Sequence, residues 1–323
     1  MIRLRGFLSL VLTAFVLFAS PVLAQDYPVR PIRIVVPFAA GGAVDSLARI
    51  VGNKLSEQLG QPVLVENKAG AGGNIAADTV AKAAPDGHTI LLTTNGLAIS
   101  PALYRSLPYD TEKDLLPVTI LIASPMVLVA TPKFAATSLK DVIAAAKAEP
   151  GKLSYGSTGI GNPLHLTMEL LKTEAGIDIV NVPYRGDAPL STALIAGDVQ
   201  LAVVPIATAR ANIEANVLRA IAITSLKRSA SVPNVPTVAE QGIAGFDMSS
   251  WQGFFVPAGT PRPIVERIAS ETRKALESPD VKARLAGFAA EAVGNSPDEF
   301  AKSFKEDLAR YAKIVQAAKI PLQ

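Results

Sequence analysis

A small-residue turn with the letters GSTGIGN, at residues 156–162, carries the groups best suited to chemistry. Its glycines lack the order of a dinucleotide fingerprint, and Asn162 stands where a phosphate loop needs its lysine, so we expect no nucleotide. The turn instead offers backbone N–H groups at the start of a helix, with the Ser157 and Thr158 hydroxyls beside them. Such donors can hold a carboxylate without a cation. A tight turn with an N-cap explains the same residues equally well.

A second turn, PFAAGGAVD at residues 37–45, poses the same choice. Its paired glycines permit a left-handed or closely approaching backbone. Asp45 lies near the start of the following helix, where capping is its commonest role; otherwise it fixes the loop or meets a cationic part of a ligand. TTNG at 93–96 ends a strand with polar groups and suits a site wall, whereas GAGG at 70–73 is interpreted as mainly structural.

The histidines and hydroxyls do not combine into a catalytic or metal motif. Ser157 lies in YGSTG rather than in the G-x-S-x-G of a serine hydrolase. His165 falls in an apolar helical run, which favours a hydrogen-bonded structural role over ligand contact, and His88 lies in a turn before a strand. Two separated histidines without clustered carboxylates predict no metal site. We expect no catalytic residue, no metal and no cofactor.

The turn PYRGDAP, at residues 183–189, carries two further charged candidates. Asp187 is expected to cap the following helix, and Arg185 is either a solvated charge or a carboxylate clamp. Trp251 is the only tryptophan. It belongs either to the core or to the wall of a cleft, and the sequence favours neither.

The first 24 residues have the pattern of a signal peptide cleaved near Ala24. Arg3 and Arg5 precede an apolar run at 7–18, which is shorter than the roughly 20 residues that a membrane anchor needs. No cysteine follows Ala24, so lipid attachment is not expected. The chain should be exported and freely soluble.

Composition excludes several classes of function. Loss of Arg3 and Arg5 reduces Lys plus Arg from 31 to 29 against 28 Asp plus Glu, so the net charge falls from +3 to +1. Without a basic patch, nucleic acid is not an expected partner. The chain has 0 cysteines, which rules out disulfides, zinc–thiolate sites and cysteine nucleophiles.

The turns are joined by alternating strand and helix patterns. IRIVVPF at 32–38 is typical of a strand buried on both faces, and SLARIVGNKLSEQLG at 46–60 carries a helical apolar stripe. This alternation continues to Pro205 and predicts parallel sheets covered by helices. Because the turns at 37–45 and 156–162 share one plan, we predict two α/β lobes. Each lobe presents a helix N-terminus at the carboxyl end of its sheet, where ligands bind.

Four stretches together resemble the extracytoplasmic solute receptors of tripartite tricarboxylate transporters, the Bug-type periplasmic binding proteins. They are YPVRPIRIVVPFAAGGAVDSLAR, VLVENKAGAGGNIAADTVAKAAPDGHTILLTTNG, YGSTGIGNPLHLTMELL and VPYRGDAPLSTALIAGDVQLAVV. The resemblance covers essentially the whole mature chain, and this ordered series of motifs is highly specific.

The resemblance implies an α/β, two-lobed periplasmic-binding-protein fold, in which each lobe has a mostly parallel sheet flanked by helices. Lobe 1 would hold residues 25–124 and 249–323, lobe 2 residues 125–248, with two crossings between them. A small carboxylated ligand would bind between the lobes, mainly through backbone amides and ordered water. The protein would be a periplasmic monomer, and its partners would be integral-membrane permease subunits.

The residues that map onto the family's binding site are Phe38, Ala39, Gly41, Gly42, Asp45, Thr94, Asn95, Gly96, Ser124, Ser157, Thr158, Gly159, Gly161, Asn162, His165, Arg185, Gly186 and Asp187. Two departures stand out. Ala39-Ala40 replaces prolines that are usual in the first turn, and Asn162 and Asp187 replace small or hydroxyl residues, which predicts an altered ligand. Asp187 would repel a carboxylate unless the ligand also carries an amine or the side chain caps its helix. The rival functions are a secreted hydrolase using Ser157 or His165, and a ligand sensor for a signalling partner.

Overall fold

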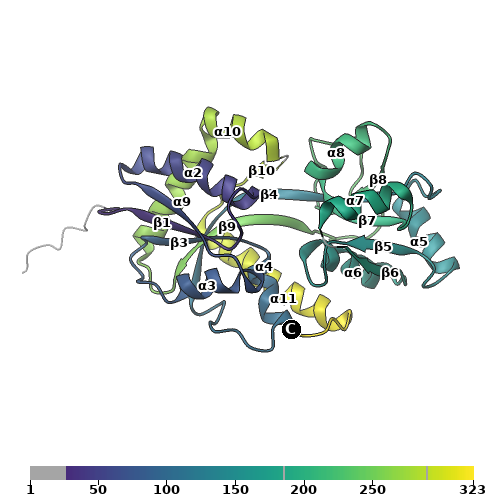
Figure 1. The fold of residues 1–323 in the computed structure, drawn as a ribbon, viewed down its shortest axis with the longest axis horizontal. Helices are drawn as coiled ribbons and strands as arrows, with labels where there is room; N and C mark the ends of the chain where they lie inside the picture. Colours follow the sequence, from purple (N-terminus) through teal and green to yellow (C-terminus); the bar gives the residue numbers. More distant parts are fainter. Residues whose placement is uncertain (1–26, 185, 289) are drawn as a thin grey trace, which may run out of the picture.

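The computed structural model describes residues 27–184, 186–288 and 290–323, which form two α/β halves joined through one sheet (Figure 1). The strands are β1 (Ile32–Val36), β2 (Val63–Asn67), β3 (Thr89–Thr94), β4 (Leu115–Ala130), β5 (Ser154–Ser157), β6 (Val180–Pro183), β7 (Leu201–Pro205), β8 (Arg219–Ile223), β9 (Ser249–Pro257) and β10 (Glu291–Ala292). The helices are α2 (Ala43–Leu59), α3 (Asn74–Ala81), α4 (Gly96–Leu103), α5 (Leu139–Ala148), α6 (Pro163–Ala175), α7 (Asp187–Ala196), α8 (Ile206–Glu214), α9 (Arg262–Glu277), α10 (Pro279–Leu285) and α11 (Pro297–Ala317), with short 3-10 turns at η1 (Ala71–Gly73) and η2 (Ala286–Phe288).

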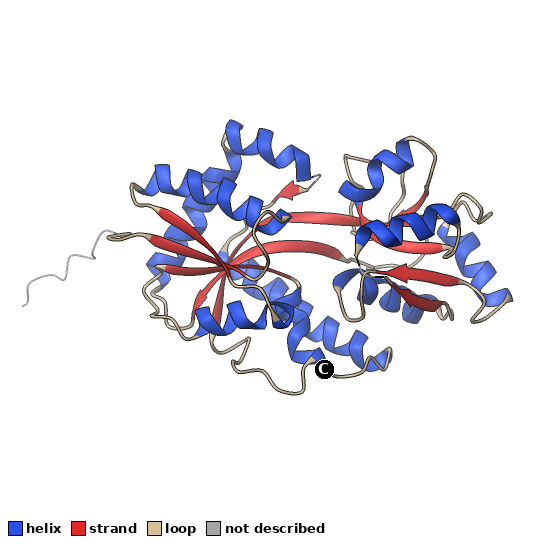
Figure 2. Ribbon diagram, viewed as in Figure 1, coloured by secondary structure: helices blue, strands red, loops and turns tan. Residues whose placement is uncertain are grey.

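The two strands β4 and β9 connect the halves. Described strands follow the order β2-β1-β3-β9-β4-β7-β5-β6, with β8 and β10 also pairing with β4. Up to Pro125, β4 pairs with β9, and from Met126 it pairs with β7, so one strand passes from the first half into the second. The chain returns at Ser249, where β9 begins. Figure 2 shows strands running from one half into the other. We call β1–β3, β9, β10, α2–α4, α9 and α10 the first half, and β5–β8 with α5–α8 the second half.

This architecture confirms the predicted two-lobed α/β fold with two crossings, but its sheet is more mixed than expected. In the described strands, β1 pairs in parallel with β2 and β3, and β5 does so with β6 and β7. Every pair that includes β4 or β9 is antiparallel. The reason is connectivity, because a strand that carries the chain out and one that carries it back must run in opposite directions.

The elements around the first turn form where the sequence pattern predicts them. Both Ile34 and Val35 in β1 are fully buried, as expected of a strand covered on two faces. The apolar stripe of α2 buries Leu47, Val51 and Leu55 against the sheet. The helix ends at Gly60, whose left-handed φ of 67° favours glycine. Strand and helix therefore present the turn between them at the carboxyl edge of the sheet.

The largest group of core contacts extends through both halves. Leu91 and Phe255 of the first half belong to the same apolar cluster as Leu128 and Tyr155. The helix α11 contributes to this cluster, and it contacts both α4 and α6 (Figure 1). Trp251, 5% exposed, lies in this core with its ring against aromatic residues of β9 and α11, rather than in the wall of a cleft. Among the described helices, none is long and apolar enough to cross a bilayer.

Candidate functional site

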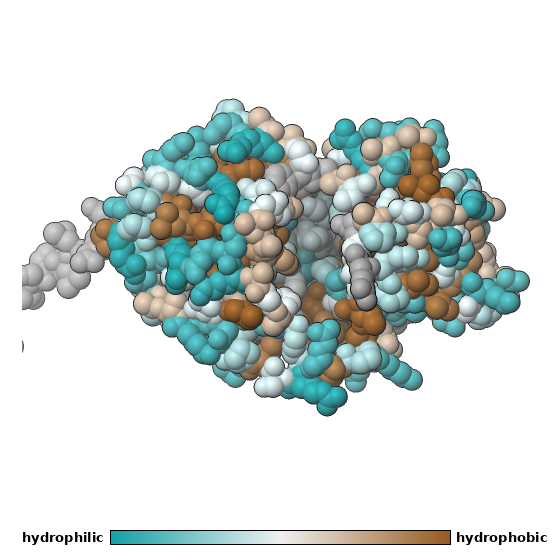
Figure 3. All heavy atoms as spheres, in the orientation of Figure 1, coloured by the Kyte–Doolittle hydropathy of each residue, from teal (hydrophilic) through white to brown (hydrophobic). Residues whose placement is uncertain are grey.

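The predicted turns lie at the carboxyl ends of β1, β3 and β5. In the space-filling view the surface is hollowed between the two halves (Figure 3). At the crossing itself, Ser124 pairs with Ser250 and Pro125 with Ser249, so hydroxyl side chains lie where β4 and β9 run between the halves. The strand order β2-β1-β3 reverses beside β1, and the carboxyl edge at such a switch point is where α/β sheets commonly bind ligands.

Asp45 is 2% exposed and fixes the first turn, residues 37–42, from the protein interior. The Gly41 N–H donates to the Asp45 carboxylate at 2.9 Å, and Arg49 donates to both of its oxygens at 3.0 Å. Asn67 donates to Asp45 at 2.9 Å and to the Phe38 carbonyl oxygen at 3.0 Å. The hydrogen bonds from Arg49 are the main cause that lowers the pKa of Asp45 to about 2. Of the roles considered for Asp45, the structure shows loop fixing.

The expectation that Asp45 caps α2 is wrong, because Gly42 occupies the N-cap position and Asp45 lies three residues into the helix. Gly42 makes no side-chain cap bond, so the N-terminus of α2 is not closed by its own cap residue. Residues Phe38, Ala39, Gly41 and Gly42 are exposed beside it. An uncapped helix start with exposed backbone is suited to an anion.

Several polar groups of the turn after β3 already form hydrogen bonds within the protein. Thr94 Oγ1 accepts from the Gly96 N–H at 3.3 Å. Asn95 is 1% exposed, and its amide N–H groups donate to the Ser249 carbonyl and the Tyr311 hydroxyl at 3.0 and 3.1 Å. The structure therefore gives Asn95 partners inside the protein instead of leaving its amide open to a ligand.

The GAGG turn packs between the turns after β1 and β3, which fits its expected structural role. A Cβ at Gly73 would lie 3.2 Å from Pro37, and a Cβ at Gly72 would lie 2.7 Å from the Tyr104 hydroxyl. A Cβ at Gly96 would lie 3.8 Å from the Gly72 carbonyl oxygen. These close approaches bring the first-half turns together at one edge.

The second turn closes on itself through its own side chains. Asn162 caps α6, because its Oδ1 accepts from the His165 N–H at 2.9 Å while its Nδ2 donates to Thr158 at 2.9 Å. The Gly161 N–H donates to His165 Nδ1 at 3.1 Å. The expected free N–H groups at the helix start are thus fewer than predicted, because Pro163 has none and His165 uses its own. Gly159 and Gly161 keep φ values of 137° and 81°, which favour glycine.

Ser157 and His165 do not form a catalytic pair in the described structure. His165 is 4% exposed, stacks on Tyr155 with 6.2 Å between ring centroids, and accepts through Nδ1 from Gly161. Burial lowers the pKa of His165, so the neutral ring that this bond requires is favoured. Ser157 is 1% exposed, and its Oγ has no hydrogen-bond partner among the described residues. His165 is therefore structural, whereas the Ser157 hydroxyl is left for another partner.

The two halves approach each other at Gly161. A Cβ at this position would lie 2.6 Å from Leu103 Cδ1, so the turn of the second half lies against the last residue of α4. The same helix begins at Gly96, directly after Thr94 and Asn95. The polar turns of the two halves are thus connected through one short helix.

Sequence reasoning missed three residues near this edge. Gln252 lies opposite Thr94 and Ile122 in the sheet, and its Oε1 is buried without a partner among the described residues. A polar residue inside the apolar run WQGFFVP was the available signal. Asn67 ends β2 among other polar strand ends, and Arg49 stands four residues after Asp45, a spacing that pairs charges on a helix.

The turn before α7 is only partly described. Arg185 and the side chain of Asp187 lie outside the described residues. Gly186, with φ of 106°, takes the N-cap position that we predicted for Asp187. The helix begins at Asp187, so the backbone of this residue lies one position past the N-cap, and the capping role predicted for its side chain falls outside the described residues.

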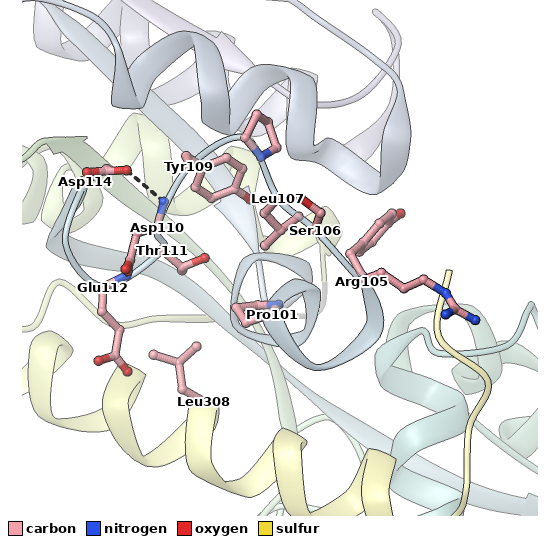
Figure 4. Close-up of a pocket in the computed structure, with 12 residues that line it drawn as sticks. Pro101, Arg105, Ser106, Leu107, Tyr109, Asp110, Thr111, Glu112, Asp114 and Leu308 are labelled. Carbon is pink, nitrogen blue, oxygen red and sulfur yellow. Dashed lines mark hydrogen bonds between the residues drawn. The ribbon is translucent and has the colours of Figure 1, made fainter.

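A separate cavity of about 650 Å³ lies outside the predicted site (Figure 4). It is lined by Pro101 of α4, by the segment that follows α4 and by Leu308 of α11, and it contains none of the predicted binding residues. Asp114 accepts from the Asp110 N–H at 2.7 Å within this segment. We base the candidate site on the turns between the halves, since they contain the unpartnered Ser157 hydroxyl and the uncapped start of α2. No group of three or more potential metal ligands occurs in the described residues.

Comparison with known proteins supports a receptor. The model of the tripartite tricarboxylate transporter family receptor matches residues 47–320. A protein from the tcbD–tcbE intergenic region of a Pseudomonas species is 42% identical over 290 residues, which is 90% of this chain and 86% of the relative.

Two solved structures have similar folds and bound carboxylates. A Rhodopseudomonas palustris protein with adipate is 35% identical, with a TM-score of 0.75, 92% of this chain covered and 100% of that one. MatC from Rhodopseudomonas palustris with bound malate is 33% identical, with a TM-score of 0.72 and coverage of 90% and 100%. The matched family is one of solute-binding receptors rather than enzymes, so the hydrolase interpretation is not retained. As the resemblance predicted, the chain belongs to the family of tripartite tricarboxylate transporter receptors.

Proposed function

We propose that this chain is a periplasmic receptor that captures a small carboxylated solute between its halves and delivers it unchanged to the permease subunits of a tripartite transporter. The observation that carries the proposal is the approach of Gly161 to Leu103. It brings the polar turn of the second half to the helix that starts at the polar turn of the first half. The adipate and malate bound by two relatives support a carboxylate as the ligand.

The proposed binding mechanism uses neutral donors from both halves. The uncapped start of α2 supplies a positive helix end, and the unpartnered Ser157 hydroxyl supplies a donor from the second half. When the halves close, water is excluded and each of these hydrogen bonds strengthens. Hinge closure of this kind is a known way to bury a ligand between two domains. Recognition would then require no dedicated cation.

We further propose the lobe boundaries 25–124 with 249–323 and 125–248, with the first 24 residues removed on export to the periplasm. The change of partner along β4, between Pro125 and Met126, supports the first boundary. The start of β9 at Ser249 supports the second. All eighteen residues predicted from the family remain proposed parts of the ligand site, with Asn95 and His165 acting through their neighbours.

Isothermal titration calorimetry tests the binding step directly. Protein refolded from denaturant, and therefore free of carried-over ligand, is titrated with succinate, malate, adipate, citrate, glutamate and glucose. We expect micromolar or tighter binding of at least one carboxylate and none of glucose. Glutamate tests whether Asp187 contacts an amine. Failure of every carboxylate would contradict the proposal.

Delivery is tested in cells. Deletion of this chain should abolish uptake of the bound carboxylate, and restoring the chain should restore uptake. Uptake that is unaffected, together with a lost transcriptional response to the same compound, would instead indicate a sensor.

A further inference from the structure

Asn95 joins three segments that are far apart in the sequence. One N–H of its amide donates to the Ser249 carbonyl oxygen at 3.0 Å and the other to the Tyr311 hydroxyl at 3.1 Å. Its Oδ1 accepts from the Trp251 N–H at 2.8 Å. Both Asn95 and Tyr311 are 1% exposed, so water does not compete for these bonds.

Each of these segments has a different place in the fold. Asn95 itself lies in the turn between β3 and α4, next to Thr94 and Gly96 of the candidate site. Ser249 and Trp251 open β9, where the chain returns from the second half. Tyr311 belongs to α11, which contacts α4 and α6. Asn95 therefore bonds a site turn to a crossing strand and to a helix that touches both halves.

Other bonds from α11 strengthen this junction. Asp307 Oδ2 accepts from the Trp251 indole N–H at 2.7 Å. One turn later, Arg310 donates to the Asp247 carbonyl oxygen at 2.8 Å, just before β9 begins. The helix thus holds the crossing on both sides of Ser249. A change in the angle of this crossing must therefore displace the groups that α11 and Asn95 hydrogen-bond.

We propose that Asn95 is a positioning residue, which couples the Thr94–Gly96 turn to the second crossing and to α11 so that the turn moves with the crossing when the halves close. This inference rests on the proposed function and deepens it, because it gives Asn95 a role in closure instead of ligand contact. A buried amide with both N–H groups bonded cannot turn toward a ligand without leaving its present partners unsatisfied. Its bonds instead keep the turn in one geometry before the ligand arrives, which reduces the cost of binding.

The variant Tyr311→Phe tests this coupling with the smallest possible change. It removes only the hydroxyl that accepts from Asn95 and keeps the ring in the core. A matched control exists, because the Tyr109 hydroxyl donates to Asn74 Oδ1 at 2.7 Å in the same half and is also buried. Tyr109→Phe removes an equivalent bond in which no residue of β9 or α11 takes part.

Hydrogen–deuterium exchange of the ligand-free protein gives the deciding measurement. We expect Tyr311→Phe to speed exchange about tenfold at the backbone N–H groups of Gly96 and Trp251, on opposite sides of the Asn95 amide. Tyr109→Phe should leave these rates within twofold of the natural chain. Unchanged rates in Tyr311→Phe, or equal acceleration by both variants, would overturn the coupling.

Affinity for malate and adipate provides the second measurement. Tyr311→Phe should bind whichever probe the natural chain binds about tenfold more weakly, with Tyr109→Phe within twofold. Equal affinity in Tyr311→Phe and the natural chain would also refute the inference. If the natural chain binds neither probe nor any other carboxylate, the proposed function fails, whereas the exchange rates still decide the coupling.

Discussion

The two turns of the candidate site follow one plan in the sequence but are stabilised in opposite ways. The turn at 37–42 is exposed, and a buried, ionised Asp45 holds it from below. The turn at 156–162 is partly buried, although Ile160 is exposed, and it is closed by neutral groups, the Asn162 amide and the His165 ring. One helix start is left without a side-chain cap and the other is capped.

The difference indicates separate roles for the two halves. The exposed turn uses its Gly41 N–H on Asp45 but leaves the start of α2 without a side-chain cap, so it is suited to first contact with an anion. The capped turn uses donors in hydrogen bonds within the turn, but it leaves the Ser157 hydroxyl without a partner among the described residues. It is therefore suited to complete the site once closure supplies the ligand.

Gly161→Ala should have the largest effect. The residue has a φ of 81°, and an added Cβ would lie 2.6 Å from Leu103 Cδ1. A left-handed alanine costs about 1–2 kcal/mol, and overpacking adds about 1–3 kcal/mol. We expect urea unfolding to show a loss of stability of about 3 kcal/mol, together with a tenfold or greater loss of affinity.

Gly41→Ala is the matched control in the other turn. Its φ of 85° is similar, but nothing lies within 4 Å of an added Cβ. It should lose only the backbone contribution, about 1–2 kcal/mol. Equal losses in the two variants would show that contact with Leu103 does not matter.

Asp45→Ala should destabilise the exposed turn by about 2 kcal/mol, since hydrogen bonds to charged groups contribute about 1.5–3 kcal/mol. The low pKa of Asp45, about 2, means that its contribution is present above the unfolded pKa near 3.8 and is lost as the pH falls toward 2. Unfolding in urea at pH 7 and pH 3 measures both effects. Asp45→Asn can keep the Gly41 bond and should lose less; a larger loss in Asp45→Asn would contradict this account.

Ser157→Ala should lower the affinity for the ligand without lowering the stability of the fold. Removal of a buried hydroxyl without a partner leaves stability unchanged or slightly higher, because no bond is lost. Affinity should fall about tenfold, or about 1.4 kcal/mol, if the hydroxyl meets the ligand. Thr131→Val is the control, since Thr131 Oγ1 is also buried without a partner but lies in the segment after β4. If calorimetry finds equal affinity for the natural chain, Ser157→Ala and Thr131→Val, Ser157 does not belong to the site.

Lowering the pH from 7 to 5 should destabilise only the turn closed by His165. We expect this change in stability to be the smallest of those described. Because burial lowers its folded pKa, the stability from neutral His165 is full above the unfolded pKa of about 6.5 and is lost as the pH falls through the folded pKa. We expect the natural chain to lose about 1 kcal/mol or less between pH 7 and pH 5. His165→Gln should flatten this dependence, whereas His88→Gln, the other histidine variant, should retain it. A pH profile unchanged in His165→Gln would exclude this origin.

Much of the fold was predictable because it rests on local periodicity. The buried strand at 32–36 and the helix at 43–59 follow directly from β-branched runs and an apolar stripe. The family resemblance added the two crossings, which no local pattern reveals. The antiparallel pairs of β4 and β9 were not predicted, because the directions of these two strands depend on the whole path of the chain.

The site was predicted less completely. Sequence reasoning named both turns, and it favoured a structural role for His165, which the structure shows. It favoured Asp45 as the cap of α2, but Gly42 holds that position, because a shift of three positions decides which residue lies at the helix end. Gln252 was missed because its neighbour Thr94 is remote in sequence and close only through strand register.

The sequence by itself determined where strands, turns and helices alternate, that the chain contains no cysteine, and to which family it belongs. These properties depend on residue type and short-range spacing. Only the tertiary structure decided which donors are already used and which remain free. Asn67, Asn95 and Asn162 have the same side chain, yet their partners differ, because hydrogen bonds depend on which groups the folded chain brings within about 3 Å.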